Sequence, residues 1–482
     1  MPNASTKVIG QRLRKSRVPQ IQASLAVALG AFSVGNVLGW SSPGLPSLLT
    51  SGHFPDLTKS DVSWIGSIIT LGALVGSILT GFCIEMFGRR NSILIAAFPL
   101  LAGWSCIVIA SNYHFLYLIF GRLFTGIGMG CLLIAGPIYL SEIAEPEIRG
   151  TLTSTFSVHM TLGIVFTYIL GCFVNYKILA AVCGAVPIFM LAAVSLLPES
   201  PRFFITRWKI QQTVDSFCWL HGCDKKSPSP EVLQEMRELQ DALGGNDEEI
   251  RSIFKQLSSW KVMKPLLTVF GIMLVNQLSG GNAFAFYTVM IFEGFNEGAG
   301  LVDSHLSAVI VSLFQLVSVT SMFVLVDKVG RRVLLVCMFL VMSSSLVTLG
   351  MLDYFKYDLE RVISKDGCNW ISLVCFVLLN AAYSGGPSVL SWTLMSELVP
   401  SNIMGLASGA TTGFNWILAF LTTRFFHDIV EVLGLQLTFF MFSIFALSGA
   451  LFIHFVVPET KGKSLEGIQR ENFHDDDDKV IQ

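Results

Sequence analysis

The 482-residue sequence has few charged side chains and no cysteine pattern that would form a framework. Only 14% of its residues are Asp, Glu, Lys or Arg, whereas a soluble domain has about 25%. The ten cysteines include no C-x-x-C pair and no Cys/His cluster with metal spacing. No nucleophile–base set is evident either. The sequence therefore argues against a soluble domain and indicates no metal, no cofactor and no enzyme.

The sequence contains several long stretches without charged residues, and 52% of its residues are hydrophobic. Because a bilayer core of about 30 Å needs roughly 20 apolar residues per helix, these runs predict an all-α polytopic membrane protein. Four runs contain no Asp, Glu, Lys or Arg: 21–52, 153–176, 368–396 and 405–423. Twelve spans are expected, at 21–41, 62–84, 91–111, 115–137, 153–175, 178–198, 264–293, 303–326, 332–352, 368–397, 404–426 and 434–458.

The basic residues predict the orientation. With a cytoplasmic amino terminus, 25 of the 32 Lys and Arg residues fall on the cytoplasmic side, as the positive-inside rule requires. Both termini are then cytoplasmic. The seven others are Lys59, Arg122, Lys177, Lys356, Arg361, Lys365 and Arg424.

Three short motifs occur twice in the same order. "EMFGRR" (85–90), "SEIAEPEIRG" (141–150) and "PESPR" (198–202) return as "DKVGRR", "SELVPSNIMG" and "PETKG", at offsets of 242, 255 and 260 residues. Two parallel six-helix repeats are typical of a major-facilitator-type transporter. The expected parts are a tail 1–20, a bundle 21–198, a cytoplasmic helical linker 199–263, a bundle 264–458 and an acidic tail 459–482.

The linker and the tail carry weaker signals. Ser229 and Pro230 predict a helix start, Gly244-Gly245 its end, and the apolar spacing of 250–257 a second helix. These helices are expected to lie against the cytoplasmic face of the two bundles. The alternative is that the segment only tethers one bundle to the other. "DDDDK" (475–479) matches a protease-recognition or tag sequence and also fits a native acidic tail.

Acidic and basic side chains recur together at the repeated turns. Arg forms bidentate pairs with carboxylates, so pairs between the two bundles are predicted to hold the cytoplasmic side shut. The alternative is that these Arg residues only set the orientation. The predicted gate residues are Glu85, Arg89, Arg90, Glu142, Arg149, Glu199, Arg202, Asp327, Arg331, Arg332, Glu397 and Glu459.

Several amides fall inside predicted spans, where an unpaired polar group is costly. Amides both donate and accept, which suits sugar hydroxyls, although they also join helices to one another. "SGG" (279–281) is expected to break its helix. The amides are Asn276, Gln277, Asn282, Gln315 and Asn415.

The motifs together resemble the sugar porter family of the major facilitator superfamily over residues from about 20 to 465. "GRLFTGIGMG" (121–130), "PIYLSEIAEPEIRG" (137–150), "NQLSGGNAFAFY" (276–287) and "PETKGK" (458–463) carry the likeness, with the repeated motifs above. "GWSSPGLPSL" (39–48) and "SWIGSIITLGALVGS" (63–77) look most like insect facilitated trehalose transporters and related hexose carriers.

The resemblance implies a facilitative carrier for a hexose or trehalose, working by alternating access as a monomer in the plasma membrane. It implies a central sugar site at the amides and Ser157, with Trp392 as a flat apolar face, and outer-gate aromatics at Phe286 and Tyr287. No nucleic acid partner is expected.

The sequence departs from the family pattern at four places. Ser157 stands where Gln is usual, and Met404 where Arg is usual. Glu85-Met86 replaces Asp-Arg, and "SVLSW" (388–392) keeps only the Trp of Gly-Pro-x-Pro-Trp, although Gly385, Gly386 and Pro387 retain one breaking point.

Two alternatives remain open. A proton–sugar symporter is disfavoured because the first span, at "GNVLGW" (35–40), has no acid; His159, the one titratable group predicted mid-span, is either a relay or a structural hydrogen-bonding group. A non-transporting sugar sensor is favoured by Met404 and the lost prolines, and disfavoured by short tails. The choice between trehalose and glucose stays open.

Overall fold

A computed structural model describes residues 17–145, 147–223, 260–295, 303–356, 364–399 and 403–461, with a few more between 233 and 240. Within these residues the chain is helical, and no strand occurs. The caps predicted at Ser229 and Gly244-Gly245 and the helix predicted at 250–257 lie outside them.

The first half contains seven α-helices and one 3₁₀ turn before the linker. They are α1 (Val18–Gly39), α2 (Ser41–Thr50), α3 (Lys59–Phe87), α4 (Arg89–Ile109), η1 (Ala110–Asn112), α5 (Leu116–Ile143), α6 (Arg149–Gly171) and α7 (Tyr176–Ser195). The described linker helices are α8 (Pro201–Ile205) and α9 (Ile210–His221), which pack on each other.

The second half repeats this succession with more interruptions. Its helices are α12 (Trp260–Leu278), α13 (Gly281–Phe286), α14 (Thr288–Phe295), α15 (Ser304–Val329), α16 (Arg331–Tyr354), α18 (Lys365–Gly385), α19 (Pro387–Leu398) and α20 (Met404–Val456).

Eleven helical segments of the described chain are long and apolar enough to span a membrane. One of them, α20, consists of two arms that meet at Gly434, whose φ of 78° and ψ of 162° are not helical. Glycine adopts such a positive φ without the steric cost of a Cβ atom. Counting the two arms separately gives the twelve spans predicted.

The predicted helix breaks are confirmed. Gly280, with φ 79°, separates α12 from α13, and Gly386 separates α18 from α19, which begins at Pro387. Proline suits the first position of a helix because its missing N–H would have no intrahelical acceptor there.

Some helix ends differ from those predicted. The first span ends at Gly39, close to the predicted residue 41, and a separate helix, α2, continues the helical path to Thr50. The second span begins at Lys59 rather than 62, where Thr58 and Asp61 form a reciprocal capping box that stabilises the first turn.

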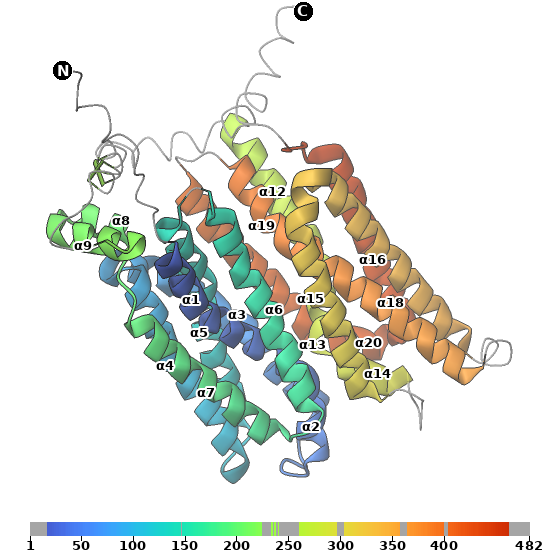
Figure 1. The fold of residues 1–482 in the computed structure, drawn as a ribbon. Helices are drawn as coiled ribbons and strands as arrows, with labels where there is room; N and C mark the ends of the chain where they lie inside the picture. Colours follow the sequence, from blue (N-terminus) through green and yellow to red (C-terminus); the bar gives the residue numbers. More distant parts are fainter. Residues whose placement is uncertain are drawn as a thin grey trace, which may run out of the picture.

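The two halves lie side by side, with the blue-to-green helices on one side and the yellow-to-red helices on the other (Figure 1). Helix α3 packs against α20 and α6 packs against α15, so these two pairs form most of the boundary between the halves. Within the first half, α1 crosses α6.

The α1–α6 crossing depends on two glycines in direct contact with the opposing backbone. A Cβ atom on Gly35 would lie 1.9 Å from the carbonyl oxygen of Met160, and one on Gly163 would lie 2.3 Å from that of Phe32. Small residues of this kind allow membrane helices to approach closely.

We expect Gly35→Ala to lower the stability of the purified protein in detergent, because backbone atoms cannot yield as side chains do. The expected cost is about 1–3 kcal/mol, typical of overpacking, and it is measured as a fall in thermal midpoint. Gly81→Ala is the matched control, because a Cβ atom there meets nothing within 4 Å. Equal midpoints for the two variants would contradict the prediction.

Candidate functional site

A cavity lies between the two halves. It contains about 650 Å³ of space not filled by atoms, part of it open to solvent. Residues from α1, α6, α13, α15, α18 and α19 line it. The polar lining residues are Ser157, Thr161, Tyr168, Asn282, Gln315, Tyr383, Ser384 and Ser388.

The predicted amides form two hydrogen-bonded groups beside this cavity. Asn282 Nδ2 donates to Gln277 Oε1 over 2.8 Å, and Gln277 Nε2 donates to Asn415 Oδ1 over 2.8 Å. Gln315 Nε2 donates to Asn380 Oδ1 over 3.3 Å. Each lining amide thus has its orientation fixed by a neighbour, while its oxygen accepts from no described residue.

The structure brings most of the predicted site residues together. Ser157, Asn282, Gln315 and Phe286 line the cavity, and Gln277 and Asn415 lie behind Asn282. Two others are not among the lining residues: Asn276, which is buried with no described partner for Oδ1, and Trp392, which is half-buried. Their role in binding stays a prediction.

The break between α13 and α14 places Tyr287 where the halves meet. Its side chain is fully buried, and its hydroxyl donates to the carbonyl oxygen of Thr423 over 3.2 Å. On the other half, a Cβ atom on Gly66 would lie 2.7 Å from that hydroxyl. The absence of a side chain at Gly66 therefore lets the two halves approach each other here.

All described hydrogen bonds and ion pairs between the halves lie toward the end that contains the start of α3, here called the α3-start end. Tyr168 donates to the carbonyl oxygen of Ala285 over 2.8 Å, and the Val289 N–H donates to Ser42 Oγ over 3.3 Å. Lys59 and Glu431 form an exposed ion pair.

Arg424 has several of these contacts. Its guanidinium donates to Ser60 Oγ over 3.1 Å and lies over the Trp64 ring at 5.2 Å, while Ser63 Oγ donates to its carbonyl oxygen. We call Arg424, Ser60, Ser63 and Trp64 the α3–α20 latch. No sequence motif marked these residues as a contact between the halves.

The opposite end, called the Gly-Arg-Arg end, contains both repeated turns. In the first half, Arg89 pairs with Glu142 at 2.9 Å, and Glu199 Oε1 accepts the backbone N–H groups of Arg89 and Arg90 at 2.8 and 2.9 Å. A carboxylate at the start of α4 satisfies unpaired N–H groups and suits the helix dipole.

The second half repeats this arrangement. Arg331 pairs with Glu397 at 3.2 Å, and Glu459 accepts the N–H groups of Arg331 and Arg332 at 3.1 and 3.2 Å. Asp327 adds an i,i+4 pair with Arg331. Glu397 thus has an Arg partner even though Met404 replaces the usual Arg.

The expected pairs between the two bundles do not occur among the described residues of the Gly-Arg-Arg end, where each ion pair joins residues of one half. Arg90 and Arg332 donate instead to backbone carbonyl oxygens, at Val194 and at His454. The side chains of Glu85, Arg149 and Arg202 have no partner within the described chain.

Arg122 is one of the seven basic residues that the charge count did not assign to the cytoplasmic side, and the structure places it in the protein interior. Its side chain is fully buried in α5, where it donates to the carbonyl oxygen of Val37 at 3.0 Å and to Ser41 Oγ at 2.6 Å. Its guanidinium lies 5.0 Å from the centre of the Trp40 ring. No described carboxylate lies within ion-pair distance, so neutral acceptors and a cation–π contact stabilise this charge.

His159 lies on α6 outside the cavity lining. Its Nδ1 is 2.8 Å from the carbonyl oxygen of Thr155, one turn earlier in the same helix. This contact supports the structural reading of His159.

The fold and the cavity define a class: a two-half helical membrane transporter with a cavity between the halves. The family model for sugar (and other) transporters matches residues 22–471, so the chain belongs to that family. It is 32% identical over 450 residues to the facilitated trehalose transporter Tret1 of Bombyx mori, covering 93% of this chain and 86% of that one. It is 34% identical to Tret1 of Polypedilum vanderplanki, covering 94% and 88%.

Solved structures give the same fold. The xylose transporter XylE from E. coli, in an inward open conformation, matches with a TM-score of 0.77 at 20% identity, over 94% of this chain and 99% of that one. XylE bound to 6-bromo-6-deoxy-D-glucose matches with a TM-score of 0.74 at 22% identity, over the same shares. The architecture is therefore the major facilitator fold.

Replacing Glu199 tests the helix-capping role. Glu199→Gln removes the charge that accepts the first N–H groups of α4, and we expect a loss of about 1–2 kcal/mol in stability, measured as a lower thermal midpoint in detergent. Glu85→Gln is the control, because its carboxylate has no described partner. A Glu85→Gln effect as large as that of Glu199→Gln would refute the assignment.

Replacing Arg424 tests the α3–α20 latch. We expect Arg424→Ala to increase the population open at the α3-start end about five- to thirtyfold, because bonds worth about 1–2 kcal/mol join the halves only when that end is closed. Spin labels on cysteines introduced at the exposed Asp56 and Val432 would report the separation.

Lys59→Gln is the control for this experiment, because an exposed ion pair contributes little. The exposed Cys172 and Cys337 are replaced by Ser beforehand. An unchanged distance distribution in Arg424→Ala would show that the latch does not hold this end closed.

Proposed function

We propose that the chain is a facilitative transporter that moves a hexose or trehalose down its gradient by alternating access. The observation that carries the proposal is the cavity between the halves, whose lining combines orientated amides with hydroxyls. Such groups suit a neutral polyol, because each can meet a sugar hydroxyl without adding charge. The relatives named facilitated trehalose transporters support the same substrate class.

The surroundings of Arg122 support facilitation rather than proton coupling. A proton-driven cycle needs a buried group that takes up and releases a proton at membrane depth. Arg122 is bound by Val37, Ser41 and Trp40, all neutral. Within the described residues, therefore, no carboxylate lies beside this buried cation to take up and release a proton.

The contacts between the halves support a two-state cycle. Residues 21–198 and 264–458 are proposed as the two moving units, with both termini and the linker in the cytoplasm of a plasma-membrane protein. The α3-start end then faces the outside, and the structure is closed on that side. The Arg–carboxylate pairs of the Gly-Arg-Arg end lie within each unit, so we propose that they keep each unit rigid; pairing between the units would belong to the opposite state.

A proton-coupled symporter is the second candidate, because XylE, which has this fold, is described as a proton:xylose symporter. The neutral surroundings of Arg122 count against it. The sensor alternative loses support as well, since Arg331 and Thr460 both bind Glu397 despite the change at Met404.

Counterflow of labelled glucose and labelled trehalose into proteoliposomes tests the proposal. We expect saturable exchange of at least one sugar that does not change when a pH gradient is imposed, because no proton-binding step is needed. Accumulation driven by the gradient would favour the symporter. Sugar binding without exchange would favour the sensor.

A further inference from the structure

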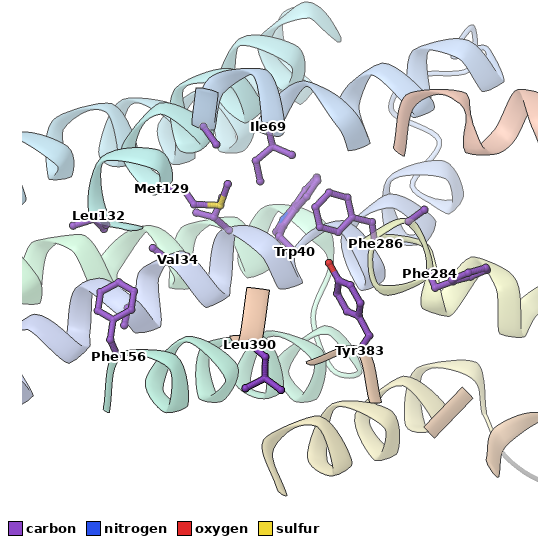
Figure 2. Packing of buried hydrophobic residues seen from close by; sticks show 14 of the residues in the cluster. Val34, Trp40, Ile69, Met129, Leu132, Phe156, Phe284, Phe286, Tyr383 and Leu390 are labelled. Carbon is purple, nitrogen blue, oxygen red and sulfur yellow. The ribbon is translucent and has the colours of Figure 1, made fainter. Parts of the chain in front are cut away.

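Tyr383 contributes a polar group to the cavity that the motif analysis did not select. It lies near the end of α18, two residues before Gly385, and lines the cavity while only 6% exposed. In Figure 2 its hydroxyl points away from the α18 backbone, toward Phe286 and Trp40.

The Tyr383 hydroxyl has no protein partner among the described residues, unlike the hydroxyls of three of the four other buried tyrosines; that of the fourth, Tyr176, is also unpaired. Tyr139 donates to the carbonyl oxygen of Pro198 and Tyr168 to that of Ala285, both over 2.8 Å, and Tyr287 donates to that of Thr423. Buried tyrosine hydroxyls usually find a partner, because an unpaired one loses its hydration without compensation. A hydroxyl that faces a cavity obtains its partner from whatever occupies that cavity.

The ring of Tyr383 is fixed in place by Gly281. A Cβ atom on Gly281 would lie 2.1 Å from Cδ2 of the ring and 2.3 Å from Cε2, so the ring lies directly on the first residue of α13. Because α13 also carries Asn282, this contact sets the position of the Tyr383 hydroxyl relative to the amide group.

The adjacent helix break removes one intrahelical donor next to the cavity. Pro387 would be the donor to the carbonyl oxygen of Tyr383 in a continuous helix, but proline has no N–H. The carbonyl oxygen of Tyr383 therefore has no donor from the backbone position that would supply one in a continuous helix.

We infer that Tyr383 is a specificity-determining residue, whose hydroxyl hydrogen-bonds one hydroxyl of the bound sugar. The inference rests on the proposed function and adds to it a contact that discriminates between sugars. A site that presents such a hydroxyl disfavours an analogue lacking the contacted group, because the Tyr383 hydroxyl then stays unpaired. The amide oxygens of Asn282 and Gln315 supply acceptors, and the Tyr383 hydroxyl supplies a donor.

The test compares the wild-type chain with Tyr383→Phe, which removes one oxygen atom and keeps the ring on Gly281. Equilibrium binding and counterflow are measured for whichever of glucose and trehalose the wild type exchanges, and for its monodeoxy analogues. We expect Tyr383→Phe to weaken binding of the parent sugar about 2- to 10-fold, the range for one hydrogen bond.

The decisive readout is the coupling between protein and sugar. One monodeoxy analogue should bind the wild type as weakly as the parent binds Tyr383→Phe, and that variant should no longer distinguish the two sugars. Tyr139→Phe, which removes a buried hydroxyl outside the cavity, is the control and should keep the wild-type discrimination.

Unchanged parent affinity and unchanged deoxy-sugar discrimination in Tyr383→Phe would overturn the inference while leaving the proposed function intact. Absence of saturable sugar binding and exchange in the wild type would overturn both.

Discussion

Among the residues that the structure describes, polar contacts connect the two halves at one end only, and the equilibrium between closed and open forms depends on that asymmetry. Arg424, Tyr168 and Ser42 each take part in a bond across the boundary at the α3-start end. At the Gly-Arg-Arg end, the stronger charged pairs stay inside each half. Separation of the halves at the α3-start end therefore costs a few neutral or partly exposed hydrogen bonds rather than a buried ion pair. A small free-energy difference between the closed and open forms suits an equilibrium that the binding of a neutral ligand can shift.

The first half contains a buried charge that takes no part in this boundary. Arg122 lies on the Trp40 ring and bonds to Val37 and Ser41, so it joins α5 to the junction of α1 and α2. That junction leads directly to Ser42, which accepts from Val289 of the other half. A cation with neutral partners thus supports the wall of the cavity without offering a site for protons.

The sequence predicted the fold because its strongest signals are physical necessities: apolar length, glycine at forced turns, and a repeat of charged motifs. The breaks at Gly280 and Gly386 and the amides Asn282 and Gln315 followed from the same logic. Arg122 and Tyr383 could not be recognised, because whether a side chain reaches a surface, a ring or a cavity depends on helix rotation and packing. The Gly-Arg-Arg pairs were expected between the bundles. The sequence shows which charged residues lie near a helix end, but it does not show which neighbouring helix each of them faces.

The unbroken first arm of α20 carries Arg424 and Met404 on either side of Asn415, whose amide bonds to Gln277. At 1.5 Å per residue, Arg424 lies about 14 Å and Met404 about 17 Å along the axis from that position. The arm therefore extends to nearly equal lengths on either side of a residue that is hydrogen-bonded beside the cavity. If the second half tilts as a unit about this level, an outward displacement at one end of the arm accompanies an inward displacement of similar size at the other. Gln277 and Asn415 both belong to that half, so their bond would move with it and keep its geometry.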